Sequence, residues 1–233
     1  MAKEQISNTN SGGNAVLFGQ HEWTRILVPG FFFTILLSLF YESFLTRYLP
    51  VRLDLLLSIL LFAGFTLTAG LTMYARETPK RRKAFQENQP SQYLSAKLRT
   101  MKGMNLLDDA EAQRLYFYIL NIHVPPAFYE KIFLFGTVYH IMVQIRRTTF
   151  WFALTGTLAA LYQISAGIQL ANQQGLMVFT IGVWLLYVLN VRYNKADRKM
   201  QENYQDQILW LQMNNDLVED VLRRRQSVPP FRP

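Results

Sequence analysis

Four long apolar windows constrain the fold of this chain more than any other feature of its sequence. They cover residues 26–46, 55–75, 148–171 and 172–191, whereas the two ends and the middle of the chain are polar. A bilayer core of about 30 Å needs about 20 helical residues, because each advances the helix by about 1.5 Å. All four windows meet or nearly meet this length. The sequence therefore predicts an all-α, polytopic membrane protein with four transmembrane helices and a helical cytoplasmic layer.

The windows divide the chain into six segments. We expect a flexible N-terminal tail (1–22), a transmembrane hairpin (23–75), a cytoplasmic helical segment (76–147), a second transmembrane hairpin (148–191), a cytoplasmic amphipathic helix (192–226) and a disordered C-terminus (227–233). No cleavage site follows the first apolar run, which favours a true membrane helix over a signal peptide. Pro29-Gly30 predicts a bent or unwound entry to the first span, and Thr78-Pro79 predicts an interruption directly after the second.

A further apolar stretch, 132–145, lies in the middle segment. Pro125-Pro126 precedes it and predicts the end of the helix before it. Its charge-free length of about 14 residues is too short to cross a bilayer. The sequence leaves open whether this stretch is re-entrant, interfacial or soluble.

Lysine and arginine are distributed unevenly, and their distribution predicts the orientation. Segment 76–147 holds twelve of them and the tail from residue 192 holds eight, whereas the link between the first two spans holds only Arg47 and Arg52. Positively charged loops stay in the cytoplasm. With four spans the two basic segments lie on one side. We therefore expect a protein of the bacterial inner (cytoplasmic) membrane with both termini in the cytoplasm.

The most basic stretch, MYARETPKRRKAF, begins where the second span ends. Its basic residues are Arg76, Lys80, Arg81, Arg82 and Lys83. We interpret this basic cluster as a topology determinant that contacts lipid headgroups or a partner. Nucleic acid is the weaker alternative, because no nucleic-acid-binding motif accompanies the cluster.

The third span carries a face of small and polar residues at helical spacing. The face consists of Ala153, Gly156, Thr157, Ala160, Gln163 and Gly167. Small side chains let helix backbones approach closely, and a glutamine can form a hydrogen bond across the contact. Two interpretations stay open, which are packing inside one four-helix bundle and a subunit interface or pore lining in a homo-oligomer.

Apolar residues in segment 192–226 recur at steps of three and four. This tail stripe consists of Met200, Tyr204, Ile208, Leu211, Asn215, Val218 and Leu222. The spacing predicts an amphipathic helix. We favour a cytoplasmic assembly helix that packs on its own chain or pairs with copies of itself, with Asn215 fixing the register. Lying on the bilayer is less favoured, because the charges on the other face are mixed in sign.

No constellation typical of catalysis is visible. The chain lacks cysteine, so it has no thiolate nucleophile or thiolate metal ligand. His21, His123 and His140 lie far apart in the sequence, and we expect them to be polar interface residues. Glu42, near the end of the first span, is expected to be an interface carboxylate, with a pore mouth as the alternative. We predict no catalytic residue, no metal and no cofactor, and we identify no small-molecule substrate.

These patterns predict a non-enzymatic membrane scaffold or sensor. It would form homo-oligomers and couple the bilayer to a cytoplasmic protein partner. The alternative is a pore- or channel-type membrane effector, and a membrane enzyme acting on lipid-like substrates is least favoured. In layout, hairpins that feed cytoplasmic helices are similar to small membrane effectors and sensors of prokaryotic stress and defence systems, although no motif supports this resemblance.

Overall fold

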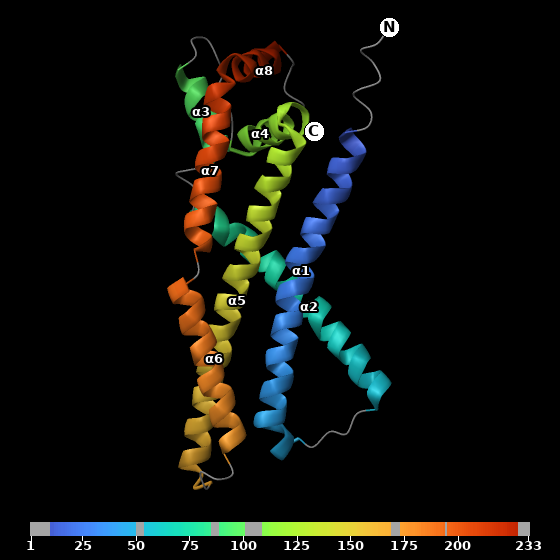
Figure 1. The fold of residues 1–233 in the computed structure, drawn as a ribbon, viewed down its shortest axis with the longest axis vertical. Coiled ribbons are helices and arrows are strands. Elements are labelled where there is room, and N and C mark those ends of the chain that lie inside the picture. Colours follow the sequence, from blue (N-terminus) through green and yellow to red (C-terminus); the bar gives the residue numbers. More distant parts are fainter. Residues whose placement is uncertain are drawn as a thin grey trace. The chain divides into compact units, whose positions relative to one another are not determined.

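The computed structural model of the protein describes residues 10–49, 54–84, 89–100, 109–168, 173–193 and 195–227. At residues 10–18, 77–84, 100, 109 and 226–227 it describes the backbone and not the side chain. Within the described ranges the regular structure is helical and contains no strand (Figure 1). The predicted all-α class is therefore confirmed.

The chain divides into two compact units. The span unit consists of residues Gln20–Thr78 and Thr137–Ala196. The polar unit consists of residues Met1–Gly19, Pro79–Gly136 and Asp197–Pro233. The span unit contains η1 (Leu45–Arg47) and α6 (Gln174–Tyr193), most of α1 (Asn10–Ser43) and of α2 (Leu55–Ala84), and the later part of α5 (Pro126–Ser165).

Three stretches among the described residues are long and apolar enough to cross a membrane. They are Gly19–Ser43, Leu55–Arg76 and Gln174–Met213, of which the last owes its apolar character to α6. The sequence predicts a fourth, at 148–171, and the structure does not contain it as such. The helical part of that window ends at Ser165. Its mean hydropathy is lowered by polar residues, namely Thr148, Thr149, Thr155, Thr157 and Gln163.

Two helices continue through prolines. The sequence predicts a bent or unwound entry at Pro29, whereas α1 contains Pro29 within one helix that begins at Asn10, inside the predicted tail. The helix at Pro29 is therefore not unwound. The predicted interruption at Thr78-Pro79 is wrong, because α2 continues to Ala84. A proline lacks only its own N–H donor, and a helix can bend to accommodate its ring.

Helix α5 is one continuous helix of 40 residues. It begins at Pro126, a favourable first position because the missing N–H would have no partner there. The stretch 132–145 is therefore part of a long helix and not a short helix of its own. Arg146 and Arg147 lie at the predicted boundary, but arginine has a high helix propensity and does not end a helix.

Helices α1 and α2 approach each other backbone to backbone. A Cβ atom at Gly30 would lie 2.0 Å from the carbonyl oxygen of Thr66, and one at Gly70 would lie 2.2 Å from that of Ile26. Across the same contact, Thr66 Oγ1 donates a hydrogen bond to Thr34 Oγ1 at 3.2 Å. Small residues permit this approach, which is how helices associate in membranes. We call this contact the glycine seam.

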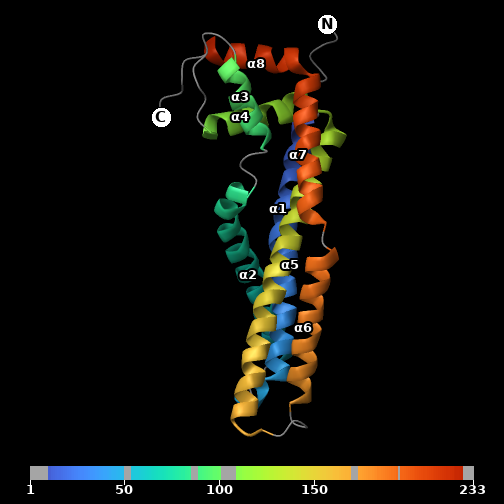
Figure 2. The same ribbon diagram turned by 90° about the vertical axis from the view of Figure 1, so that its left-hand side faces the viewer.

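The core of the span unit lies between α1, α5 and α6. It consists of Leu36, Phe40, Phe152, Ala153, Ala159, Leu176, Phe179 and Val183. Helices α5 and α6 run antiparallel and side by side (Figures 1 and 2). Phe150 packs against Tyr187 with ring centroids 5.5 Å apart, and Gly156 faces Thr180 further along the pair. Residues of α5 from about Thr148 onward thus lie beside two of the stretches that could cross a membrane.

The polar unit has a separate apolar core. Its helices are α3 (Pro90–Thr100), α4 (Asp109–His123), the first part of α5, α7 (Ala196–Met213) and α8 (Asn215–Ser227). The buried residues are Leu94, Leu98, Leu115, Tyr116, Ile119, Leu120, Val124, Tyr129, Phe133, Leu211, Val218, Val221 and Leu222. Ion pairs join its helices at the surface, including Lys97–Glu219 at 3.4 Å, Lys131–Asp206 at 2.8 Å and Arg225–Glu111.

The C-terminal segment forms two helices, whereas the sequence predicts one helix over 192–226. The turn between α7 and α8 lies at Asn214. The Asn214 side chain donates a hydrogen bond to the carbonyl oxygen of Trp210 at 2.8 Å. Such local side-chain bonds compete with the helical backbone pattern. Figure 1 shows that α8 turns away from the axis of α7.

Candidate functional site

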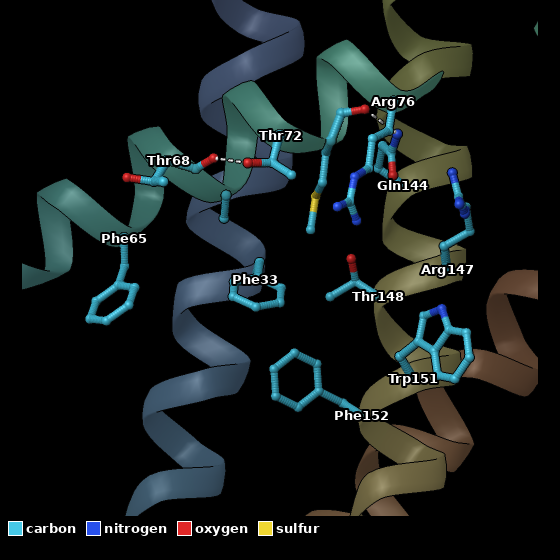
Figure 3. Close-up of a pocket in the computed structure, with 12 residues that line it drawn as sticks. Phe33, Phe65, Thr68, Thr72, Arg76, Gln144, Arg147, Thr148, Trp151 and Phe152 are labelled. Carbon is cyan, nitrogen blue, oxygen red and sulfur yellow. Dashed lines mark hydrogen bonds between the residues drawn. The ribbon is translucent and has the colours of Figure 1, made fainter. Parts of the chain in front are cut away.

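The span unit contains a cleft of about 450 Å³ between α1, α2 and α5 (Figure 3). Its lining residues are Phe33, Phe65, Thr68, Ala69, Thr72, Met73, Arg76, Gln144, Arg147, Thr148, Trp151 and Phe152. The volume falls in the range of about 300–1,000 Å³ that is typical of small-molecule sites. All twelve residues belong to the span unit, so the cleft is formed within one compact body.

One end of the cleft is polar and positively charged. Arg76 is the last residue of the stretch Leu55–Arg76, and Arg147 lies on α5 across from it. Between them, the buried Gln144 donates a hydrogen bond from Nε2 to the carbonyl oxygen of Met73 at 3.2 Å, which ties α5 to α2. Both arginines are exposed, and neither forms an ion pair with a carboxylate among the described side chains.

The other end of the cleft is aromatic. Figure 3 shows the rings of Phe33, Phe65, Trp151 and Phe152 away from the guanidinium groups. Phe33 and Phe152 meet edge to face, with ring centroids 5.4 Å apart. The hydroxyls of Thr68 and Thr72 donate to backbone oxygens of α2, at 2.6 and 2.8 Å, and so are already satisfied. A charged end and an apolar end together fit an amphiphilic ligand.

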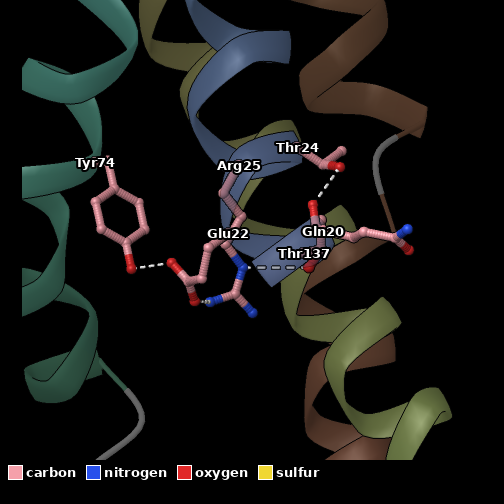
Figure 4. A network of polar contacts seen from close by, with 6 residues as sticks. All are labelled: Gln20, Glu22, Thr24, Arg25, Tyr74 and Thr137. Atoms are coloured by element: carbon pink, nitrogen blue, oxygen red, sulfur yellow. Dashed lines mark hydrogen bonds and ion pairs between the residues drawn. The ribbon is translucent and has the colours of Figure 1, made fainter. Parts of the chain in front are cut away.

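A polar network joins the same three helices (Figure 4). Arg25 Nη1 contacts Glu22 Oε1 at 3.1 Å, and Arg25 Nε donates to Thr137 Oγ1 at 3.2 Å. The Tyr74 hydroxyl donates to the second carboxylate oxygen of Glu22. The network thereby connects α1 with α2 and with α5. Because its partners lie up to 112 positions apart in the sequence, no sequence pattern indicates this arrangement.

The predicted small-residue face of the third span lies inside the chain. Ala153 and Gln163 are buried, with Gln163 only 2% exposed. A Cβ atom at Gly156 would lie 2.7 Å from Thr180 Oγ1, and Thr157 Oγ1 accepts a hydrogen bond from Trp184 Nε1 at 3.0 Å.

The remaining two residues of that face, Ala160 and Gly167, have separate roles. Ala160 packs, partly buried, against the core of the span unit. Gly167 adopts a left-handed φ of 71° just after α5 ends. The backbone N–H of Ile168 donates to the carbonyl oxygen of Gln163 at 3.1 Å, which is typical of a glycine-terminated helix. Gly167 therefore ends the helix.

The tail stripe faces the core of the polar unit. Met200, Leu211, Val218 and Leu222 are buried, and Tyr204, Ile208 and Asn215 are partly buried. Asn215 Nδ2 donates to Glu219 Oε1 at 2.9 Å. This hydrogen bond and a second one from Lys97 lower the pKa of the Glu219 carboxyl. Asn215 therefore forms its side-chain hydrogen bond within its own helix, to the Glu219 carboxylate.

Apolar periodicity does not identify two buried amide side chains on α7. Asn203 and Gln207 are one turn apart and nearly inaccessible, with Asn203 2% exposed. The Tyr116 hydroxyl donates to Gln207 Oε1. Burial raises the pKa of Tyr116 well above its ordinary value, and the nearby Tyr204 raises it further. Their polar character hides them from a search for apolar periodicity, although they occupy the same face as Met200 and Leu211.

The remaining candidate residues lie apart from one another. Of the basic cluster, Arg76 lines the cleft, whereas the side chains of Lys80, Arg81, Arg82 and Lys83 are outside the described residues. His140 is buried beside Tyr74 and His123 packs against Tyr118, while Glu42 is exposed near the end of α1.

Among the described residues, no group of three or more His, Asp or Glu side chains could hold a metal ion. The cleft is therefore the site that the arrangement of side chains best defines. No protein-family model, no curated protein and no solved structure matches this chain.

Proposed function

We propose that the chain is a non-enzymatic, four-span integral membrane protein that acts as a scaffold or sensor. In this proposal the polar unit lies in the cytoplasm and binds a partner protein, and the span unit holds it at the bilayer. The observation that carries the proposal is the division into two units, one with apolar helices exposed along their length and one with its own buried core.

The packing of α5 supports a fourth span. Phe152 and Ala153 are buried against α1 and α6, and both of these helices contain a stretch that could cross a membrane. A helix that packs lengthwise between two spans shares their depth. The threonines in this part of α5 satisfy their hydroxyls internally, as Thr155 and Thr157 do by donating to the carbonyls of Trp151 and Ala153 at 2.8 Å. Backbone-satisfied hydroxyls reduce the cost of placing these residues in lipid.

Four spans and the basic segments set the proposed orientation. Both basic segments, 76–147 and the tail from residue 192, then lie in the cytoplasm with both termini. A periplasmic phosphatase reporter fused after Pro233 in a bacterial host should be inactive, and a cytoplasmic fluorescent reporter at the same site should be bright. The reverse result would contradict this topology.

Native mass spectrometry of the purified full chain tests the scaffold function. We expect a homo-oligomer or a co-purifying protein, and we expect it to be lost when residues 195–226 are deleted. A matched variant, Lys131→Gln, removes an exposed ion pair and a cation–π contact with Phe128 in the polar unit, and should keep the complex. A lone monomer without a partner would contradict the scaffold proposal.

The pore alternative has less support from the geometry. It requires the face of Gly156, Thr157 and Gln163 to surround an axis shared between subunits. Within the chain that face is occupied by Thr180 and Trp184 of α6. Liposomes containing the purified protein should therefore retain a small fluorescent dye, and rapid leakage would favour a pore.

A further inference from the structure

In the membrane location proposed above, the cleft of the span unit lies where the bilayer changes from hydrocarbon to headgroups. Arg76 ends a stretch that is long and apolar enough to cross a membrane, and the residues before it are free of charge back to Leu55. Gln144 is hydrogen-bonded to Met73, so this part of α5 is level with the last turn of that stretch. In that location the charged end of the cleft lies at headgroup depth, and its aromatic end lies deeper.

The charged end complements a phosphate group. It presents two guanidinium groups, and none of the described residues that line the cleft carries a carboxylate. A guanidinium can donate two parallel hydrogen bonds to phosphate oxygens, and it keeps its charge at every physiological pH. Basic pockets between transmembrane helices are sites where anionic lipid headgroups bind. An acidic peptide would match the charge but would not fill the aromatic end.

The aromatic end complements an acyl chain. Trp151 and Phe65 are largely exposed, and Phe33 and Phe152 form the inner wall. Helix α2 makes one side of the cleft and is little covered elsewhere, since only 11% of its candidate span is buried. An acyl chain in the bilayer can therefore reach these rings from the side.

We propose that this cleft binds one anionic phospholipid. The phosphate lies between Arg76 and Arg147, and an acyl chain runs along Phe33, Phe65 and Trp151. The proposal rests on the membrane location proposed above, and it does not depend on the scaffold role. It concerns a specific site, in contrast to a general attraction of basic residues to an anionic surface.

The test measures lipid retention by the full-length protein in nanodiscs. Protein reconstituted in phosphatidylcholine with phosphatidylglycerol should retain phosphatidylglycerol after release into the mass spectrometer, in preference to phosphatidylcholine. The double variant R76Q/R147Q should bind phosphatidylglycerol about tenfold more weakly, because it loses two charge-assisted contacts at a partly exposed site. The variant R192Q removes an equivalent exposed charge from the last turn of α6 and should stay within about twofold of the wild type.

Two further measurements distinguish a phospholipid from a soluble phosphate and test the role of the guanidinium groups. Lysine at both positions should restore part of the preference, because it keeps the charge and loses the planar fork. Soluble glycerol phosphate should not displace the lipid, and displacement would assign the site to a soluble phosphate and overturn the proposal. Equal retention of both lipids, or equal losses in R76Q/R147Q and R192Q, would also overturn it. Absence of the chain from the membrane fraction would instead contradict the proposed location.

Discussion

The two units bury their apolar residues in opposite ways. In the polar unit, large apolar side chains such as Ile119 and Val218 face inward, and the Lys131–Asp206 ion pair is exposed. In the span unit, many large apolar side chains face outward, and helices α1 and α2 meet through glycine backbones. In water, the hydrophobic effect favours the burial of apolar side chains. In lipid this effect is absent between helices, so close packing must hold them together. The difference agrees with the proposal that the span unit lies in lipid and the polar unit in water.

The largest effect should come from emptying the core of the polar unit. Ile119, on α4, is 0% exposed, whereas Ile181, on α6, is 68% exposed. Ile119→Ala should destabilise the polar unit by about 2–5 kcal/mol, because it leaves a cavity. Ile181→Ala should have little effect in detergent micelles, since its side chain exchanges one apolar environment for another. Hydrogen exchange of α4 peptides would measure the first change and that of α6 peptides the second, and equal effects would contradict the comparison.

The glycine seam should give the next largest effect. Gly30→Ala and Gly70→Ala place a methyl group against a backbone oxygen and should cost about 1–3 kcal/mol or more. Gly64→Ala is the matched control on α2, because no atom lies within 4 Å of its added Cβ. It should be neutral or stabilising by up to about 1 kcal/mol. Thermal unfolding in detergent, monitored by tryptophan fluorescence, distinguishes the variants. Destabilisation by Gly64→Ala would contradict the role assigned to the glycine seam.

An intermediate effect is expected at alkaline pH in the polar unit. Burial raises the folded-state pKa of Tyr116, so its contribution to stability is present below the unfolded value of about 10 and is lost at higher pH. Tyr116→Phe should lower stability at neutral pH by about 1–2 kcal/mol, because Gln207 loses a buried donor. Tyr116→Phe should also reduce the loss of stability at alkaline pH. Tyr118→Phe, at an exposed tyrosine of α4, should leave the pH profile unchanged.

The smallest effect is expected at acidic pH. The Asn215 and Lys97 contacts lower the folded-state pKa of Glu219 below 4.5, so their contribution is present above that pH and is lost as the pH falls through the folded value. Glu219→Gln should slightly reduce the acid sensitivity of the polar unit, with an effect that decreases at high salt. Glu130→Gln, at an exposed position of α5, is the control, and an identical profile in both would contradict the assignment.

Apolar periodicity predicted much of the fold and little of the site. It identified the all-α class, the three stretches that could cross a membrane, and four buried residues of the tail stripe, because burial follows apolar spacing. It missed the continuity of α5, since charges at Arg146 and Arg147 resemble a boundary without ending a helix.

The cleft could not be predicted, because its walls come from three helices distant in sequence. Phe33, Thr72 and Trp151 carry no shared motif. Charge was the sequence feature that pointed to the cleft, since Arg76 and Arg147 each adjoin an apolar window. Pairing the two required the hydrogen bond from Gln144 to Met73, which only the folded chain supplies.

The sparse cover of α2 has a consequence for how the cleft would fill. A lipid that enters beside α2 never passes through water, so its arrival is governed by diffusion within one leaflet. Occupancy would then follow the mole fraction of anionic lipid in that leaflet, and dilution of the bulk sample would leave it unchanged. Exchange of one lipid species for another by the cell's own synthesis would change the occupant without any soluble messenger.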